Sequence, residues 1–363
     1  MKKLLLLLLC VSLWQCSSSA PKGKKQKQEN PKTAFVFYYA AEHDIQQGNF
    51  QAALVKLDSA ISYNTGYANF YQVKGWVFEV LEKPDSAIAA YEICLKYRSN
   101  YPEVWVRIGR LYLQTKKYDN SAFYLKRAVQ SYPDSASIHL KLGEAYYFDK
   151  KYPLAMDYLR SYRKLVSTPD PQYWKWLGLT YYRTREYARS VEPLTQYVNA
   201  VPDDAQALKC LGIAKFNAGE HHDAISYLNK ASELRKDDPE IYLYRARYFL
   251  IYGKPDVARQ ELSAALSVDS SNADVLYELG VLDYKEEKYE KSKKHLAAVI
   301  AKAPDYWPVY RYLGFLAEKE QNFLKAKEYY KLYLDNTAVE DSEVLRRVNN
   351  LSSKTTGNAP EKK

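Results

Sequence analysis

The chain has 363 residues, 47% of them hydrophobic and 26% charged, and this balance excludes a protein that is disordered throughout. Its 36 tyrosines and only 13 glycines favour an all-helical protein, because helices contain little glycine and large amphipathic rings suit half-buried faces. The formal net charge of +10 lies mostly in the two end segments and leaves +2 on residues 34–351. A nucleic-acid partner is therefore not expected.

Residues 1–15 have the layout of a secretory signal peptide, with lysines at positions 2–3 and an apolar run over residues 4–14. The run is too short to cross a bilayer, since a spanning helix takes about 20 apolar residues. Cys16, which directly precedes three serines, resembles the lipid-modified cysteine of bacterial lipoproteins. Gln15 departs from that family's pattern, which has a small residue just before the cysteine.

The resemblance implies that Cys16 carries acyl chains such as palmitate and that the protein is anchored in the bacterial cell envelope. In that family Ser17, rather than aspartate, after the cysteine implies transfer to the outer membrane, with the body on its periplasmic or surface face. Two alternatives stay open: cleavage after Ala20 without a lipid, and an uncleaved anchor. Residues 16–33 are rich in Lys, Ser and Gln and are predicted to form a flexible, lipidated tether, because they cannot bury enough surface to fold.

The rest of the chain repeats with a period of 34 residues, which indicates a repeat architecture. Twelve residues after one common glycine phase every repeat has Ala or Ser, and four residues further on every repeat has Leu or Tyr. A small residue followed by a large one at i+4 predicts a helix face at a close crossing. The first glycine phase comprises Gly75, Gly109, Gly143, Gly178, Gly212, Gly280 and Gly314, and a second phase seven residues later comprises Gly48, Gly219 and Gly253.

Each repeat divides into two amphipathic segments joined by a short turn, for example residues 102–114 and 118–131. The pattern resembles the tetratricopeptide repeat, with an aromatic residue at position 4, glycine at 8, often an aromatic residue at 11, a small residue at 20 and often proline at 32. The resemblance implies an all-α fold, a right-handed superhelical solenoid of about nine helical hairpins with a C-terminal capping helix. The nine repeats are 34–67, 68–101, 102–135, 136–170, 171–204, 205–238, 239–272, 273–306 and 307–340.

A capping helix is predicted over residues 341–352, followed by a disordered tail over 353–363, because the last hairpin of a stack needs a polar-backed lid. Val344, Leu345, Val348 and Leu351 are expected on one buried stripe, with Arg346 and Arg347 turned away from it. Departures from the repeat pattern predict local repacking: Ala246 at position 8, Lys215 at position 11, and Tyr162, Tyr197 and Tyr333 at the usually small position 27.

The ionisable residues form no recognisable catalytic or metal-binding motif, so we expect no enzyme activity, no metal and no cofactor. The five histidines are scattered, and His221 and His222 are expected in an exposed turn between helices. Cys94 and Cys210 lie too far apart in a solenoid to form a disulfide. Cys94 is expected to be a small buried hydrophobic residue.

A partner-binding groove is expected along the first helices of the hairpins, because positions 2, 5, 9, 12 and 13 face such a groove in the resembled family. Aromatic rings with interleaved cations would suit an extended peptide, through amphipathic contact and pairing with carboxylates. Position 9 has none of the asparagines with which chaperone-binding relatives clamp a carboxyl terminus. The candidate groove residues are Tyr147, Phe148, Lys175, Tyr182, Arg183, Lys209, Phe216, Asn217, Arg247, Tyr277, Tyr284 and Lys285.

These features predict a non-enzymatic adaptor on the bacterial envelope that binds other envelope proteins or extended peptides, for assembly of an envelope, secretion or wall-remodelling complex. The alternative is a scaffold that binds a polysaccharide or peptidoglycan through groove aromatics. Replacement of Tyr182 or Tyr284 by alanine should weaken glycan binding, which should withstand high salt, whereas binding of a charged peptide should weaken with salt.

Overall fold

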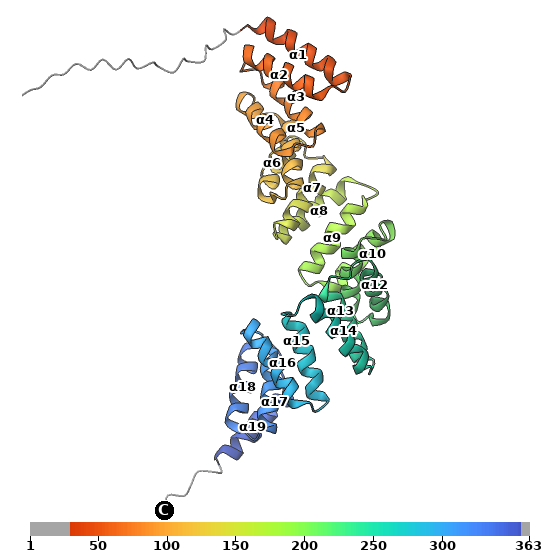
Figure 1. Cartoon of the computed structure of the whole chain (residues 1–363), viewed down its shortest axis with the longest axis vertical. Coiled ribbons are helices and arrows are strands. Elements are labelled where there is room, and N and C mark those ends of the chain that lie inside the picture. Colours follow the sequence, from red (N-terminus) through yellow and green to blue (C-terminus); the bar gives the residue numbers. More distant parts are fainter. Residues whose placement is uncertain (1–29, 357–363) are drawn as a thin grey trace, which may run out of the picture. The chain divides into compact units, whose positions relative to one another are not determined.

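The computed structural model describes residues 30–356, with side chains described up to Leu351, and within this range it has nineteen α-helices and no strand (Figure 1). The chain divides into two compact units, Met1–Tyr132 and Pro133–Lys363. The signal peptide, Cys16 and the greater part of the tether lie outside the described residues. Within each unit consecutive helices pair as hairpins, which confirms the predicted all-α fold of stacked helical hairpins.

The first unit contains three hairpins, and the second contains six hairpins and the last helix. In the first unit they are α1 Pro31–Gln46 with α2 Phe50–Tyr63, α3 Ala68–Val80 with α4 Pro84–Tyr97, and α5 Pro102–Gln114 with α6 Tyr118–Ser131. In the second unit they are α7 Ala136–Phe148 with α8 Tyr152–Leu165, α9 Pro171–Arg183 with α10 Tyr187–Ala200, α11 Ala205–Asn217 with α12 His221–Leu234, α13 Pro239–Ile251 with α14 Pro255–Val268, α15 Ala273–Lys285 with α16 Tyr289–Lys302, and α17 Pro308–Lys319 with α18 Phe323–Asn336, followed by α19 Ser342–Thr356.

The first helix begins three residues before the predicted first repeat. Asn30 caps α1 by accepting a hydrogen bond from the Thr33 backbone N–H at 3.2 Å, and Pro31 follows in the first helical turn. Proline suits that position because its missing N–H would have no helical partner there. The last three residues of the predicted tether are therefore helical.

The second glycine phase marks the turn inside each hairpin, where the backbone has a positive φ. Gly48, Gly219 and Gly253 adopt φ values of 76°, 88° and 66°. The same position holds a residue with a side chain in the other six hairpins, again with positive φ: Glu82, Lys116, Lys150, Arg185, Glu287 and Gln321. This left-handed residue ends the first helix and directs the chain into the second.

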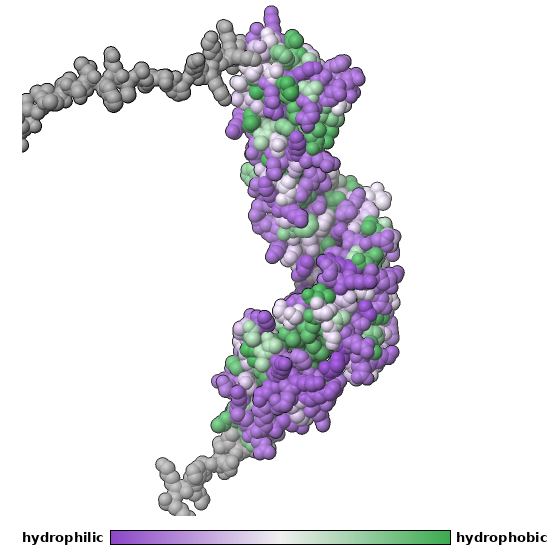
Figure 2. Space-filling model, viewed as in Figure 1, coloured by the Kyte–Doolittle hydropathy of each residue, from purple (hydrophilic) through white to green (hydrophobic). Residues whose placement is uncertain are grey.

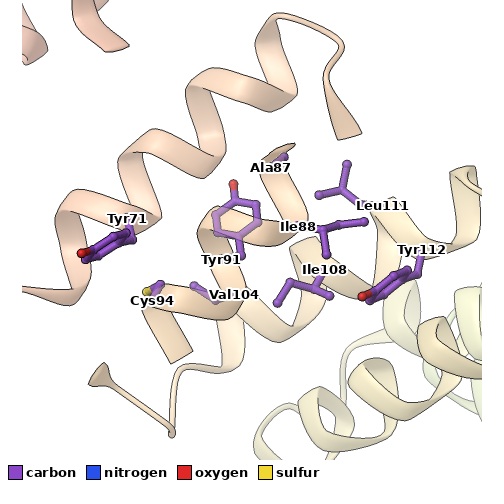
Figure 3. Packing of buried hydrophobic residues seen from close by; sticks show 9 residues of the cluster. All are labelled: Tyr71, Ala87, Ile88, Tyr91, Cys94, Val104, Ile108, Leu111 and Tyr112. Carbon is purple, nitrogen blue, oxygen red and sulfur yellow. The ribbon is translucent and has the colours of Figure 1, made fainter. Parts of the chain in front are cut away.

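The first glycine phase lies where the two helices of a hairpin cross. A Cβ added to Gly75 would lie 2.6 Å from the ring of Tyr91, a fully buried residue (Figure 3). At position 20 the hydroxyl of Ser121 donates a hydrogen bond to the Gly109 carbonyl at 2.8 Å, and Ser292 does the same to Gly280 at 2.7 Å. The small residues at positions 8 and 20 thus permit close contact of the two backbones.

In the three repeats that have a tyrosine at position 27, this tyrosine connects the hairpin to the start of the next helix. The Tyr162 hydroxyl accepts a hydrogen bond from the Asp170 backbone N–H at 2.8 Å, and the Tyr197 hydroxyl donates to the Asp204 carboxylate at 2.9 Å. Asp170 and Asp204 also cap α9 and α11. The large residue at a usually small position therefore bonds the N-cap of the following repeat.

Two other departures from the repeat pattern are accommodated locally. Lys215 at position 11 is buried, and its ammonium group pairs with Glu220 and with Asp223, the latter at 3.1 Å. Ala246 at position 8 is fully buried in one cluster with Leu262.

The last helix differs from its prediction in length and in the direction of one arginine. α19 extends to Thr356, four residues beyond the predicted end, and residues 357–363 of the predicted tail lie outside the described range. Val344 and Leu351 are buried as predicted, whereas Leu345 is exposed. Arg347 is not turned away: its guanidinium pairs with Glu318 at 3.1 Å and lies over the Phe315 ring.

Arg347 completes a set of a tyrosine, a glutamate and an arginine that also occurs in the first unit. The fully buried Tyr91 donates a hydrogen bond to Glu79, which also pairs with Arg107 of the next hairpin at 3.0 Å. In the last hairpin Tyr330 donates to Glu318 at 2.5 Å, and Arg347 completes the set. α19 therefore packs as the first helix of an incomplete tenth repeat.

Candidate interaction groove

All twelve predicted groove residues lie in the second unit, on the first helices of five successive hairpins. Tyr147 and Phe148 end α7, and Lys175, Tyr182 and Arg183 lie on α9. Lys209, Phe216 and Asn217 lie on α11, Arg247 on α13, and Tyr277, Tyr284 and Lys285 on α15. Hydrophobic residues form small separate groups among polar ones on the visible face (Figure 2).

Most of the predicted aromatic residues pack between hairpins. Tyr147 and Tyr182 expose only 8% and 9% of their surface, and burial raises the pKa of the Tyr182 hydroxyl well above its ordinary value. Tyr284 is half-buried among the rings of Tyr289, Tyr312 and Phe315. These rings therefore contribute to packing between repeats more than to an open surface.

Phe148 is the most open of the predicted rings. It is 39% exposed, and its ring makes an edge-to-face contact with Trp176 at a centroid distance of 5.1 Å. Phe216 is half-buried and packs edge-to-face on Tyr244 at 5.3 Å.

The predicted cations at position 5 pair with acidic residues of the chain itself. Lys175 Nζ lies 2.8 Å from Asp204 Oδ2, and Lys209 Nζ lies 2.8 Å from Asp238 Oδ2 and 2.9 Å from Glu240 Oε2. Both aspartates also cap the helix that follows. The cations expected to pair with a ligand's carboxylates are thus already neutralised.

The electrostatics of these pairs follow from the geometry. Burial alone would lower the pKa of Lys209, but the carboxylates of Glu240 and Asp238 outweigh burial and raise the pKa above its ordinary value. The Tyr182 hydroxyl also donates to Glu240 at 3.3 Å. Residues from α9, α11 and α13 are therefore linked in one polar network.

Arg247, at position 9, makes a similar inter-repeat pair. Its Nε donates to Glu278 of the next hairpin at 2.7 Å, and its guanidinium lies over the Tyr244 ring at 5.0 Å. Arg183 donates to the Tyr147 hydroxyl at 3.4 Å. Lys285 is exposed and forms no ion pair among residues 30–351.

A polar pocket of about 680 Å³ lies along this face of the second unit, within the size range of ligand sites. Asn217 and Arg247 are the predicted residues that line it, and the other ten do not. Prediction from the sequence missed the acids Asp238, Glu240 and Asp274, which stand next to the repeat boundaries at residues 238–239 and 272–273. The pocket is lined by Arg185, Tyr187, Asn217, Asp238, Pro239, Glu240, Leu243, Tyr244, Arg247, Asn272 and Asp274.

The pocket presents both hydrogen-bond donors and acceptors. The Asn217 amide donates to the Ile213 carbonyl at 2.8 Å and keeps its side-chain oxygen for another donor. Arg185 is exposed and has no ion pair in the described part of the chain, and Asp274 accepts a hydrogen bond from Tyr306 at 2.7 Å. An extended polypeptide, with alternating N–H and C=O groups, matches such a lining.

The cysteines and histidines make no competing site within the described residues. Cys94 and Cys210 are buried free thiols, and burial raises their pKa values to about 11 and about 12. His221 and His222 begin α12 rather than lying in the turn before it, and His222 Nδ1 lies 3.2 Å from the Tyr248 hydroxyl. No cluster of three or more His, Cys, Asp or Glu side chains suited to a metal occurs between residues 30 and 351.

None of the described helices is both long and apolar enough to cross a membrane.

Comparison with known families matches the hairpins to the tetratricopeptide repeat. Family models match residues 73–136, 106–168, 140–205 and 210–275, and a second model of the same repeat matches residues 249–317. Repeats of this type typically form non-catalytic scaffolds for protein–protein interaction.

Curated relatives are distant in sequence. The TPR repeat-containing protein YpiA of Bacillus subtilis (strain 168) is 24% identical over 227 residues, which are 62% of this chain and 51% of that protein. The protein O-mannosyl-transferase TMTC3 of Homo sapiens is 21% identical over 225 residues, 61% of this chain and 22% of that protein. The chain thus spans about half or less of these relatives.

Among solved structures, a chain of the APC/C hetero-tetramer Cut9–Hcn1 superposes with a TM-score of 0.54 at 11% sequence identity. The match covers 88% of this chain and 76% of that chain. A likeness at this identity concerns the fold alone.

Proposed function

Because the chain belongs to the tetratricopeptide repeat family, we propose that it is a protein-interaction scaffold that binds an extended polypeptide on the first-helix face of α9–α15. The observation that carries this proposal is the 680 Å³ polar pocket, to which successive hairpins contribute Asn217, Glu240 and Arg247. Its mixed donors and acceptors suit a peptide backbone. The internal pairing of Lys175 and Lys209 favours this mode over recognition of carboxylates alone.

Burial of the groove rings favours a polypeptide over a glycan. Stacking on a sugar requires an open ring face, whereas Tyr182 is 9% exposed and Tyr284 is covered by neighbouring rings. Replacing either tyrosine by alanine would therefore disturb packing between repeats.

Site-specific photo-crosslinking tests the location of the partner. A photoreactive amino acid replaces Asn217 in the pocket or, as the matched control, Ala297, an exposed residue on the second helix α16. We expect one partner protein to be captured from position 217 and not from position 297. Equal capture from both positions would contradict a binding site on the first-helix face.

We also propose that the scaffold is anchored on the bacterial envelope through a lipid on Cys16, at the outer membrane, where it gathers the proteins of an envelope, secretion or wall-remodelling complex. The support is the sequence of residues 1–19, with a positive start, an apolar run, Cys16 and three serines. Labelled palmitate should enter the wild-type protein and not the Cys16→Ala variant. Wild-type protein in the soluble fraction, or label retained in the variant, would refute the anchor.

A further inference from the structure

In several hairpins the second helix has a large ring at position 23, which covers rings of the first helix. Tyr124 stacks on Tyr112 at a centroid distance of 5.8 Å, and Tyr158 stacks on Tyr146 at 5.5 Å. Tyr112 and Tyr146 both occupy position 11 of their repeats. The repeat therefore fills this side of the hairpin with an aromatic residue of its own.

The last hairpin makes a related contact at the same side. Tyr329, again at position 23, lies 5.9 Å from Tyr310 at position 4. The side chains at positions 4 and 11 of the first helix thus form two walls of a space on this side of the hairpin, and the side chain at position 23 of the second helix fills that space. Position 23 is occupied by Lys56, Ala90, Tyr124, Tyr158, Pro193, Tyr227, Glu261, His295 and Tyr329 in the nine repeats.

The second hairpin, α3–α4, has the smallest of these residues, Ala90, and a hollow of about 250 Å³ lies there. Its walls are those seen in the other hairpins, Tyr71 at position 4 and Phe78 at position 11. The Tyr71 ring also stacks with Tyr97 at a centroid distance of 5.5 Å, and Tyr71 is visible at the edge of the core in Figure 3. The hollow is lined by Tyr71, Lys74, Phe78, Ser86, Ala89, Ala90 and Ile93.

We propose that this hollow binds an aromatic side chain, tyrosine or phenylalanine, of a partner polypeptide. The chain itself supplies the precedent, since Tyr124 and Tyr158 occupy the corresponding place in the next two hairpins. An apolar cavity of about 150 Å³ is known to hold benzene, so the hollow has room for one ring. Pockets for drug-sized ligands start at about 300 Å³, so a single side chain suits the hollow better.

The walls select an aromatic ring over an aliphatic group. Phe78, which is half-buried, offers ring surface for offset or edge-to-face contact, and the 8% exposed Tyr71 closes the wall beside it. Lys74 lies 5.8 Å from the Phe78 ring centroid and is held by an ion pair with Asp58, so a cation stands at the rim of the hollow. An entering ring can interact favourably with this cation through its face.

This site uses repeat positions that differ from those of the proposed groove. It involves positions 4, 11 and 23 of a hairpin in the first unit, whereas Asn217 and Arg247 line the pocket of the second unit. Changes in the groove should therefore leave aromatic binding at α3–α4 unaltered.

The test uses p-cresol, the side chain of tyrosine, titrated into the full-length chain and followed by ligand-observed NMR. We expect saturable binding in the millimolar range. Ala90→Tyr should weaken it at least about tenfold, because the new ring fills the hollow from within. The same variant should raise the melting temperature. The matched control Ala297→Tyr, which adds a ring at an exposed position of α16, should leave both unchanged.

Circular dichroism will establish whether Ala90→Tyr is folded. If Ala90→Tyr does not fold, the test uses Ala90→Leu, whose smaller side chain fills less of the hollow. Absence of saturable p-cresol binding, or undiminished affinity in the folded filling variant, would overturn the proposal. A second titration compares acetyl-Gly-Tyr-Gly-amide with acetyl-Gly-Leu-Gly-amide. Tighter binding of the tyrosine peptide supports an aromatic occupant, and equal affinities would refute that choice.

Discussion

Replacing Lys209 with methionine should loosen the hairpins α11–α12 and α13–α14 without unfolding the rest of the chain. The Lys209 ammonium lies 2.8 Å from Asp238 and 2.9 Å from Glu240, and the side chains of Lys209 and Asp238 are each 10% exposed. Methionine keeps most of the volume of the lysine stem. It leaves two carboxylates facing each other without a cation between them.

The size of the stability loss in Lys209→Met depends on how well water can solvate the carboxylates of Asp238 and Glu240 once the lysine is gone. Removing one partner of a buried ion pair costs about 3–5 kcal/mol when the other charge stays buried. Glu240 is 41% exposed and keeps the hydrogen bond from Tyr182, so water relieves part of the penalty. We therefore expect a loss of about 2–3 kcal/mol, below the range for a fully buried pair.

Native-state hydrogen exchange is the appropriate assay, because repeat proteins open locally and the loss is expected in only two of the hairpins. A loss of 2–3 kcal/mol corresponds to roughly 30- to 150-fold faster exchange of protected amides in α11 and α13. Lys285→Met is the control, since Lys285 is exposed and without an ion pair among the described residues. Equal acceleration in the control, or less than about threefold in Lys209→Met, would refute the reasoning.

Three further changes test the repeat itself. Gly178→Ala should destabilise the protein in urea denaturation, because the new Cβ would lie 2.7 Å from Leu194 Cγ and 3.0 Å from the Leu194 backbone nitrogen. Overpacking of this kind costs about 1–3 kcal/mol, whereas the higher helix propensity of alanine stabilises the helix by up to about 1 kcal/mol. A variant at least as stable as wild type would contradict this. Lys150→Gly should raise the melting temperature, since φ is 60° there and a left-handed residue with a side chain costs about 1–2 kcal/mol. An unchanged or lower melting temperature would speak against that strain. Asp204→Asn should be less stable than wild type near neutral pH. Burial would raise the pKa of Asp204, but the hydrogen bond from Lys175 and the other bonds outweigh it and place the folded-state pKa below its ordinary value. The carboxylate's contribution is thus present above the unfolded-state pKa and is lost as the pH falls through the folded one. Melting curves at about pH 7 and about pH 2.5 should show the gap to wild type narrowing, and a constant gap would contradict this assignment.

The spacing of residues within each repeat was sufficient to predict where the helices of the hairpins lie. The segments 102–114 and 118–131 coincide with α5 and α6, because glycine, small and large residues at fixed offsets determine where two helices can cross. The first helix was the exception at its start. Its cap, Asn30, lies in a polar segment whose composition resembles a tether.

The groove was less predictable because its chemistry depends on pairs that are about 30 residues apart. Lys175 and Lys209 have the right phase for a binding surface, but each reaches an aspartate at the end of its own repeat. Both aspartates cap the helix that follows, and the sequence gives no sign that one carboxylate can both cap a helix and pair with a lysine. The pocket lining around Asn217 likewise includes residues from turns, whose side-chain directions periodicity does not specify.

The direction of Arg347 could not be read from the apolar stripe of the last helix, because a long side chain can extend past the edge of a stripe to reach a partner. The adjacent Arg346 is exposed and forms no ion pair among residues 30–351, so the chain provides its own control. Arg347→Ala removes contacts with Glu318 and Glu343, at 3.1 and 3.0 Å, and should cost about 1–2 kcal/mol in the protection of α17 and α19 against hydrogen exchange.

Arg346→Ala should change that protection by less than about 0.5 kcal/mol, as is usual for surface substitutions. The comparison separates two roles for α19. If both variants behave alike, the helix stabilises the last hairpin only through Val344 and Leu351, which are both buried. If Arg347 alone matters, then α19 reproduces the Tyr–Glu–Arg arrangement of Tyr91, Glu79 and Arg107, and the stack ends by repeating its own interface.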